Sequence, residues 1–405
     1  MVCMLGLIWI LAGPSFGAVL FLAGGGLVVA ARADRCLHLV FRSPGLWLIP
    51  AFAVLSTLWS VAPAVTLRAA VELALTIGIA SLVAGLLRPR EFVSAMSVSL
   101  LCGAVLSLLF GRYDFDGMSG ETVFVGIFAS KNTMAAFMSF LAIFAAAVLA
   151  DRGQPSPFRL LAVVAFALSI PLLLRAHSAG AMLTAGGSLA VLLLTMAFAR
   201  LQFRERLLVL AGAGAIAVLV ALLACNGTLG ADWSSFLTEG LGKDATLTGR
   251  TMLWQYALAE IARRPFFGAG YYAFWQPGNL LAEAIWRYFD VRGGFSFHNT
   301  YLEIAVGLGW AGAAVLVVTL GVAMARAVAL ALADRSWATA ALVAVTFCLI
   351  ARTLGEADAP YPFSAGTFLL FVAAAYGADY AGVARREIFA NHAIPLLDPV
   401  SATPR

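Results

Sequence analysis

Charged residues are scarce in this sequence. Only 12% of its 405 residues are charged and 62% are hydrophobic, whereas a soluble domain carries about 25% charged residues. Too little polar surface is left to face water, and a soluble fold of this length could not bury so much apolar surface in one core. The bilayer is the remaining solvent, so the composition predicts an integral membrane protein.

Lysine is almost absent, since only Lys131 and Lys243 accompany the arginines among 26 basic residues. The net charge is +5, but the arginines are spaced along the chain between apolar stretches. No basic cluster has the pattern that follows a nucleic-acid backbone. We therefore expect no nucleic-acid partner and interpret the arginines as markers of membrane topology.

Cysteine is equally sparse. The five cysteines are scattered, with no CxxC pair and no histidine at the spacing of metal ligands. They are expected to act as small apolar residues, and we predict no metal site and no cofactor. The first charge is Arg32, so the N-terminus lacks the basic region of a cleavable signal and is expected to remain as a membrane segment.

Long apolar stretches dominate what is present. A helix needs about 20 mostly apolar residues to cross the hydrocarbon core. Eleven candidate spans lie near residues 5–31, 44–60, 65–87, 92–110, 124–150, 158–174, 179–198, 206–225, 300–325, 336–352 and 363–384. Gly13-Pro14 interrupts the first, which is therefore one kinked span or two short ones. The pattern predicts an all-α polytopic membrane protein with about 11 to 12 transmembrane helices in a single domain over residues 1–405.

Arginines distinguish the two ends of these spans. The segments on one side carry Arg32, Arg35, Arg42, Arg88, Arg90, Arg152, Arg159, Arg200, Arg204, Arg206, Arg326, Arg335, Arg385 and Arg386. They alternate with short connections that hold few basic residues, so the positive-inside rule makes the arginine-rich side cytoplasmic. The long hydrophilic loop over 226–299 is then predicted outside, and the C-terminal tail over 385–405 in the cytoplasm.

Within the long loop, residues 250–263 have the pattern of an amphipathic helix, with Leu253, Ala257 and Ile261 on one face. The loop is rich in aromatic residues, namely Trp254, Tyr271, Tyr272, Trp275, Trp286 and Tyr288. Two compatible interpretations stay open. The helix lies on the membrane surface, or it forms a lid over a site whose aromatic side chains stack on sugar rings.

Ionisable residues gather near the outer ends of the spans, where charge is usually functional or paired. Arg68 and Glu72 are four residues apart on one helix and predict a structural ion pair. Four further cations come from separate segments, Lys131, Arg175, Arg250 and Arg352. They predict a site for an anionic lipid head group such as a diphosphate, although each could merely anchor its helix at the interface.

A histidine stands where the long loop re-enters the membrane. His298 begins the segment His-Asn-Thr-Tyr-Leu-Glu. Histidine as a residue type accepts protons near neutral pH, so His298 is a candidate general base. A lone interfacial histidine is more often only a hydrogen-bonding residue, and only the neighbouring loop and cations favour the catalytic interpretation.

Four segments, in order, carry a family resemblance. They are Ser130-Lys131-Asn132, Arg175-Ala-His-Ser178-Ala179-Gly180-Ala181, Gly249-Arg250 with Trp254, Pro265 and Gly268-Ala-Gly270, and His298-Asn299 followed by ten residues and then Gly309. Together they resemble the superfamily of O-antigen ligases and of O-antigen and exopolysaccharide polymerases, over roughly residues 50–380. Leu58-Trp59-Ser60-Val-Ala-Pro63 also fits this pattern.

The resemblance implies a metal-independent, inverting glycosyltransferase of GT-C-like fold in the bacterial inner membrane. Its donor would be a glycan on undecaprenyl diphosphate, taken up at the periplasmic face, and its acceptor a glycan or the lipid A core. Membrane lipids and other polysaccharide assembly proteins would be partners. His298 and Arg250 would be catalytic, and the substrate would be bound by Lys131, Asn132, Asn299, Arg175 and Arg352.

One position departs from the family pattern. The family arginine of the second segment falls on Ala179, and Arg175 lies four residues earlier, where it could supply the charge from the same helical face. The departure favours an exopolysaccharide polymerase over an O-antigen ligase. A secondary transporter or lipid-linked oligosaccharide flippase is the alternative from another class, but transporter sites carry ionisable groups near mid-membrane, where this chain has almost none.

Overall fold

A computed structural model describes residues 6, 14–31, 38–116, 120–209, 211, 249–291 and 295–391. Its elements in chain order are α2 (Pro14–Ala31), η1 (Pro44–Trp47), α4 (Leu48–Leu55), η2 (Ser56–Leu58), α5 (Pro63–Leu86), α6 (Pro89–Phe110), β1 (Arg112–Asp116), β2 (Glu121–Gly126), α7 (Lys131–Ala150), α8 (Ser156–Arg175), α9 (Ala179–Arg200), α12 (Arg250–Arg263), α13 (Leu280–Tyr288), α14 (Thr300–Asp334), α15 (Trp337–Arg352) and α16 (Ala365–Asn391). The fold is that of a mostly helical, polytopic membrane protein.

The apolar helices agree with the predicted spans. Among the described residues, six helices are long and apolar enough to cross a membrane, and four shorter apolar helices accompany them. Most of the span predicted near 206–225 and most of the loop over 226–249 lie outside those residues, as does the tail beyond Asn391. The first predicted span is described as a helix from Pro14. Of the residues before Pro14, the structure describes only Gly6.

Helix α7 lies at the centre of the bundle, in contact with α6, α8, α9 and α15. Its alanine, phenylalanine and leucine side chains are almost all buried. On α8 and α9 the outward side chains are also apolar, for example Leu160, Leu174 and Leu194, each more than half exposed. An apolar exterior around a packed core is stable only when lipid covers it.

One predicted span contains a different element. The stretch 124–150 was expected to be helical throughout, but β1 and β2 pair antiparallel and form a hairpin before α7 begins. Thr122, Val123, Phe124 and Val125 are β-branched or aromatic residues that favour a strand. The helix starts only at Lys131, where Ser130 accepts a hydrogen bond from the backbone N–H of Thr133 at 3.2 Å. The protein is therefore not entirely α-helical.

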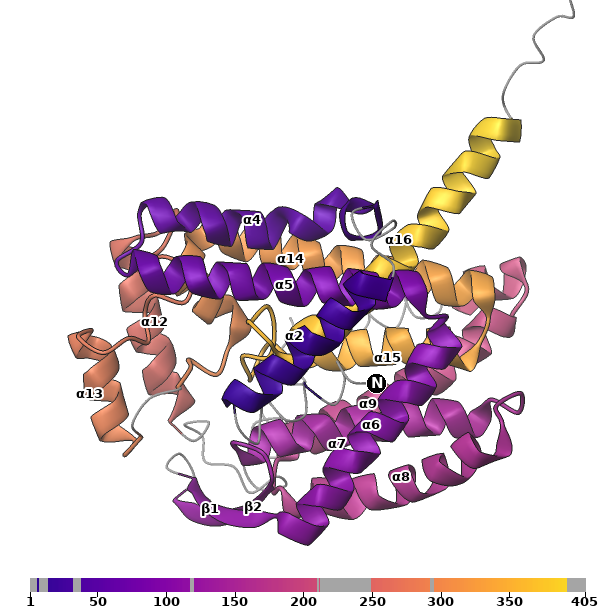
Figure 1. The fold of residues 1–405 in the computed structure, drawn as a ribbon, viewed down its shortest axis with the longest axis horizontal. Helices are drawn as coiled ribbons and strands as arrows, with labels where there is room; N and C mark the ends of the chain where they lie inside the picture. The colour runs from indigo at the N-terminus through magenta and orange to yellow at the C-terminus, as the bar shows by residue number, and fades with distance from the viewer. Residues whose placement is uncertain are drawn as a thin grey trace, which may run out of the picture.

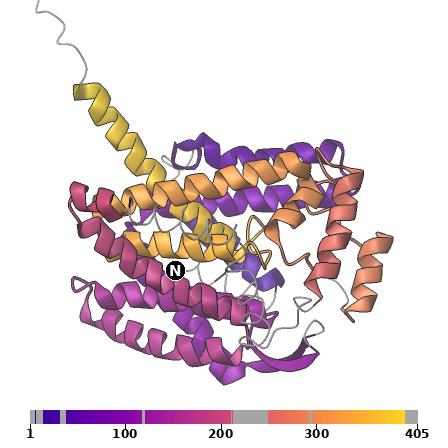
Figure 2. The same cartoon turned by 180° about the vertical axis from the view of Figure 1, so that it is seen from behind.

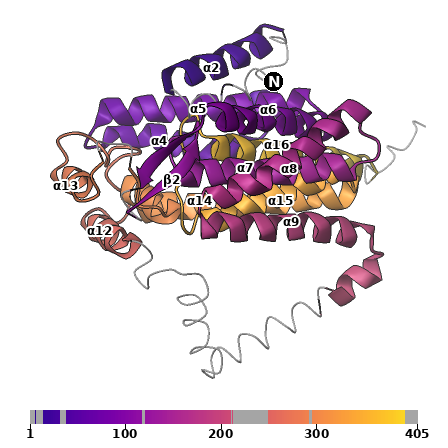
Figure 3. The same cartoon turned by 90° about the horizontal axis from the view of Figure 1, so that it is seen from below.

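The long loop contributes two helices at one end of the bundle. Figures 1 and 3 show α12, α13 and the β1–β2 hairpin at this end, and Figure 2 shows α12 and α13 there from behind. We call it the His298 end, because His298 precedes α14 here. The start of α6 with Arg90, the α7–α8 loop with Arg152 and the end of α14 before Arg335 lie at the opposite end (Figure 1).

The amphipathic helix predicted over 250–263 is confirmed as α12. Its apolar residues Leu253, Ala257 and Ile261 are buried in a second core with residues of α13 and of the start of α14. This face therefore packs against protein and not against the membrane surface. Three of the six loop aromatics named above belong to the same core, since Trp254 and Trp275 pack against it and Trp286 is buried in it.

Helix α14 is broken at Gly309, where φ is +67°. The helix's freed backbone groups pair with the loop after α12. Trp310 donates its N–H to the carbonyl of Pro265 at 2.8 Å, and the N–H groups of Ala269 and Gly270 donate to Val306 and Gly307 at 2.9 Å. Gly268-Ala-Gly270 thus permits close backbone packing.

Replacing Gly309 by alanine should destabilise the protein by about 2–4 kcal/mol. A Cβ atom at this position would lie 2.2 Å from the backbone carbon of Phe266, in a left-handed conformation that favours glycine. Thermal unfolding of the purified protein measures the effect. Gly321→Ala on the same helix is the control, because a Cβ atom there meets nothing within 4 Å. Equal melting temperatures for the two variants would contradict the proposed role of the break.

Candidate functional site

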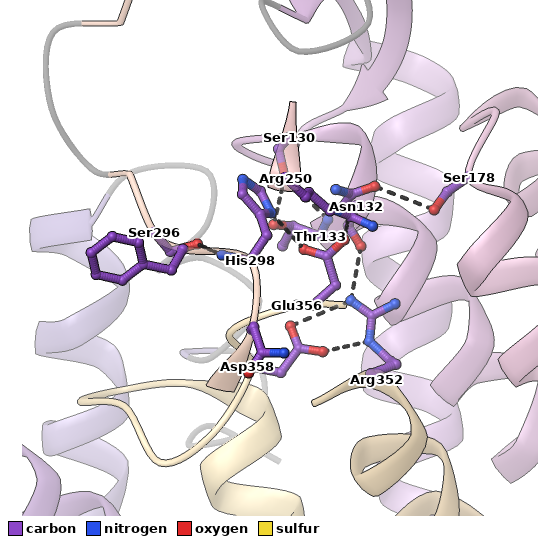
Figure 4. A network of polar contacts seen from close by, with 12 residues as sticks. Ser130, Asn132, Thr133, Ser178, Arg250, Ser296, His298, Arg352, Glu356 and Asp358 are labelled. Atoms are coloured by element: carbon purple, nitrogen blue, oxygen red, sulfur yellow. Dashed lines mark hydrogen bonds and ion pairs between the residues drawn. The ribbon is translucent and has the colours of Figure 1, made fainter. Parts of the chain in front are cut away.

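Glu356 lies at the centre of a polar network at the His298 end (Figure 4). One carboxylate oxygen accepts a hydrogen bond from Nη2 of Arg250 at 2.6 Å, and the other lies 3.1 Å from Nδ1 of His298. The three side chains are only 15–17% exposed. The start of α12, the segment that leads into α14 and the loop after α15 therefore meet at one carboxylate.

The carboxyl group of Glu356 is ionised at neutral pH. Burial on its own would raise its pKa, but the hydrogen bond with His298 and the charges of His298, Arg352 and Arg250 outweigh burial and lower the pKa below its ordinary value of 4.5. An ionised carboxylate only accepts hydrogen bonds. Nδ1 of His298 is therefore the donor in this pair, and in the neutral form of the ring the acceptor nitrogen is then Nε2.

The backbone around His298 holds its ring in place. His298 has a φ of +50°, a conformation that is strained for a residue with a side chain. Its backbone N–H donates to Oγ of Ser296 at 3.2 Å, and the Phe295 ring packs edge-on at 5.5 Å. The N–H of Phe297 donates to Glu303 at 2.9 Å. Strain of this kind is typical of functional sites, where the surrounding contacts enforce it.

Asn299 joins α14 to the loop that carries Glu356. Its Oδ1 accepts from the N–H of Leu302 at 3.1 Å as the cap of α14, and its Nδ2 donates to the carbonyl of Leu354 at 3.2 Å. Thr300 adds a hydroxyl bond to the carbonyl of Glu356 at 2.8 Å. Both polar groups of the Asn299 amide thus serve this connection, which fixes His298 relative to Glu356.

Arg352 and Lys131 also have carboxylate partners. The guanidinium of Arg352 is buried and binds Asp358 through two nitrogens, while its Nη2 donates to the carbonyl of Asn132 at 3.4 Å. Lys131 pairs with Asp116 at the end of β1. Each of these predicted diphosphate-binding cations is therefore held against an acidic side chain, and Arg352 ties α15 to the first turn of α7.

The family segment at residues 175–181 contacts the segment at residues 130–132 through a serine. Oγ of Ser178, the residue before α9, donates to Oδ1 of Asn132 at 3.2 Å. The expectation that Arg175 shares a helical face with Ala179 is wrong, because α8 ends at Arg175 and α9 begins at Ala179. His177 between them has a φ of +49°, which breaks the helix. Arg175 is exposed at the end of α8.

The structure brings together most of the predicted site residues. His298, Arg250, Asn132, Asn299 and Arg352 are linked through Glu356 and the loop that follows α15, and Lys131 adjoins Asn132. Sequence reasoning gave no role to Glu356, Asp116, Asp358 or Ser178. Glu356 and Asp358 directly follow an apolar span that ends in arginine, a position where carboxylates are usually paired.

The ion pair predicted between Arg68 and Glu72 is confirmed, with Nε and Oε1 3.0 Å apart. It lies at the same end of the bundle, in the first turns of α5. Arg68 is 82% exposed at its side chain and Glu72 26%. This pair takes no part in the hydrogen bonds around Glu356.

Comparison with known proteins identifies relatives of this architecture. The sequence profile of the O-antigen ligase family matches residues 163–317, a range that contains Arg250, His298 and Gly309. The exopolysaccharide production protein ExoQ of Rhizobium meliloti (strain 1021) is 32% identical over 334 residues, which cover 80% of this chain and 74% of ExoQ.

Proposed function

Because the chain belongs to the O-antigen ligase family, we propose that it is a membrane glycosyltransferase that takes a glycan from an undecaprenyl-diphosphate-linked donor. The observation that carries this proposal is the single carboxylate of Glu356 between His298 and Arg250. It joins a group that can accept a proton to a cation that can bind phosphate oxygens. Transfer of a glycan from a diphosphate to a hydroxyl uses the proton acceptor for the acceptor hydroxyl and the cation for the leaving diphosphate.

The proposed reaction is a single displacement at the anomeric carbon of the donor sugar. Nε2 of His298 takes the proton of the acceptor hydroxyl as its oxygen forms the new glycosidic bond. The bond from the anomeric carbon to the diphosphate oxygen breaks, and its electron pair stays on the diphosphate. Glu356 stabilises the imidazolium that results. Attack opposite the leaving group inverts the anomeric centre.

Arg250 stabilises the leaving diphosphate in this scheme. Its Nε is buried with no hydrogen-bond partner among the described residues, whereas Nη2 is held by Glu356. A guanidinium placed before the reaction stabilises developing negative charge without reorganisation. Lys131 and Asn132 line the diphosphate site from α7, and Arg175 attracts the anionic head group from the exposed end of α8. Asn299 and Arg352 are positioning residues, because their polar groups hold the site together.

We place the His298 end, with the loop over 226–299, in the periplasm, and the C-terminal tail in the cytoplasm. Arginines at the opposite end support this orientation by the positive-inside rule. Alkaline phosphatase, which is active only outside the cytoplasm, should be active when fused after Gly278 in the loop. A fusion after Gly153 at the opposite end is the matched control and should be inactive. The reverse result would invert the orientation.

Polymerisation of an exopolysaccharide is the reaction we favour over ligation to the lipid A core. The name of ExoQ and its match along 80% of this chain support that choice. A strain without its own copy should accumulate single lipid-linked repeats and recover high-mass polysaccharide when this chain is supplied. Accumulated long lipid-linked chains together with bare lipid A core would indicate a ligase instead. Unchanged glycans in the deletion strain would contradict both activities.

A further inference from the structure

A cavity opens at the His298 end, beside the first turns of α5. Its volume is about 310 Å³, and its polar lining consists of Arg68, Glu72, Tyr272 and Gln276. The apolar part of the wall also comes from α5 and consists of Ala64, Val65 and Ala69. Small-molecule sites occupy about 300–1,000 Å³ and combine apolar walls with a few polar groups, so this cavity suits a small ligand.

The charges in the cavity balance each other. Nε of Arg68 lies 3.0 Å from Oε1 of Glu72, which leaves no net charge to bind a phosphate. The pair instead offers guanidinium donors next to carboxylate acceptors, and the amide of Gln276 offers one group of each kind. Neighbouring hydroxyl groups, which both donate and accept, are complementary to this arrangement.

Tyr272 supplies an aromatic surface at the cavity. Its side chain is 49% exposed, and its backbone has a φ of +63°. The preceding residue fixes this conformation, because Tyr271 donates its N–H to Oγ of Ser56 at 3.0 Å and its hydroxyl to the carbonyl of Pro360 at 2.9 Å. The negative face of an aromatic ring attracts polarised C–H bonds, which one face of a sugar ring presents.

A chain of hydrogen bonds connects the cavity to His298. Gln276 follows Trp275, whose Nε1 donates to Oε1 of Glu303 at 2.7 Å. The other oxygen of Glu303 accepts the N–H of Phe297 at 2.9 Å, immediately before His298. One buried carboxylate therefore positions both the cavity wall and the residue proposed to activate the acceptor.

We infer that this cavity binds an uncharged sugar ring of the acceptor glycan, an assignment that rests on the proposed glycosyltransferase function. The balanced charge excludes the diphosphate end of the donor, and the connection through Glu303 relates the cavity to the proton-accepting side of the site. Binding one sugar ring of the acceptor in this cavity holds the acceptor glycan while its terminal hydroxyl reaches His298.

Binding to the purified full-length protein tests the inference without requiring turnover. The probe is the uncharged repeat-unit oligosaccharide obtained by partial hydrolysis of the polysaccharide of the host strain. Tyr272→Leu and Gln276→Ala should each weaken its binding about tenfold, as expected when roughly 1.4 kcal/mol of stacking or hydrogen bonding is lost. Binding of inorganic pyrophosphate, the probe for the cationic site, should not change in either variant.

Tyr288→Leu is the matched control. Tyr288 is 71% exposed on α13 and does not line the cavity, so its replacement should leave binding of both probes unchanged. Gln276→Ala keeps the aromatic side chain of Tyr272 and removes one hydrogen bond, from Nε2 of Gln276 to the carbonyl of Tyr272 at 3.3 Å, so it remains informative if Tyr272→Leu misfolds. Unaltered oligosaccharide binding in Gln276→Ala, or no oligosaccharide binding by the wild-type protein, would overturn the inference.

Steady-state kinetics distinguish the acceptor from the donor. In Gln276→Ala the KM for the acceptor should rise about tenfold while the KM for the lipid-linked donor and kcat at saturation stay within about twofold. A rise confined to the KM of the donor would instead assign the cavity to the donor glycan and refute the inference. If the wild-type protein transferred no glycan from a lipid-linked donor, the proposed function would fail, yet the binding measurement would still decide whether the cavity holds a sugar.

Discussion

Replacing His298 by alanine is expected to lower glycan transfer by about 10²–10⁴-fold, because a positioned general base contributes a factor of this size. Nε2 of this ring is the group that Glu356 leaves free to accept the acceptor proton. Transfer is measured with purified protein and a lipid-linked donor. In cells, the same variant should accumulate the unreacted lipid-linked glycan at wild-type protein levels.

His177→Ala is the matched control for that loss. His177 and His298 have nearly the same unusual φ, +49° and +50°, and both lie at the His298 end. His177 is exposed at the turn between α8 and α9 and does not contact Glu356, so its replacement should leave transfer within about twofold.

Glu356→Gln should lose activity while His298 remains, because an amide can hold the ring in the wrong tautomer. Full activity in His298→Ala would refute the base assignment.

Replacing Arg250 by alanine is expected to reduce kcat by about 10²–10³-fold, the usual effect of removing one group that stabilises transition-state charge. Arg250→Lys should recover only part of this loss, because a lysine keeps the charge but not the two-pronged geometry of a guanidinium. The variant also leaves the buried carboxylate of Glu356 with one partner fewer. Binding of inorganic pyrophosphate should weaken in parallel with kcat.

Arg263→Ala controls for the loss of a positive charge from α12. Arg263 lies at the other end of the same helix, where its side chain is 72% exposed and pairs with Glu260 at 3.2 Å. An exposed pair of this kind contributes little, so activity and thermal stability should remain close to those of the wild type. If Arg250→Ala bound pyrophosphate as tightly as the wild-type protein, Arg250 would not bind the diphosphate.

The fold followed from the sequence wherever hydropathy alone decides structure. The apolar stretches around 65–87, 158–174 and 336–352 each became a helix within a few residues of its predicted ends. The β1–β2 hairpin escaped prediction, because Val123, Phe124 and Val125 are as apolar as the helix that follows. The long α14 was predicted without its break, since the break depends on a loop nearly 40 residues away in sequence.

The site was predicted less completely. His298, Arg250 and Lys131 stood out because charge is rare in this chain and their motifs resemble those of a family. The carboxylates that pair with them did not, since nothing in local spacing indicates that Glu356 will lie between His298 and Arg250. The same limit explains the error at Arg175, because a helix break at His177 depends on a single backbone angle.

The position of Glu356 after α15 has a consequence for biosynthesis. The residues of the site are spread along the chain from Lys131 to Asp358, so a nascent chain carries most of its membrane helices before it carries a complete site. Only the completed loop between α15 and α16 brings the carboxylate to His298. A protein terminated before this loop would thus occupy the membrane without a complete site, and the proposed activity would come only from chains translated beyond Asp358.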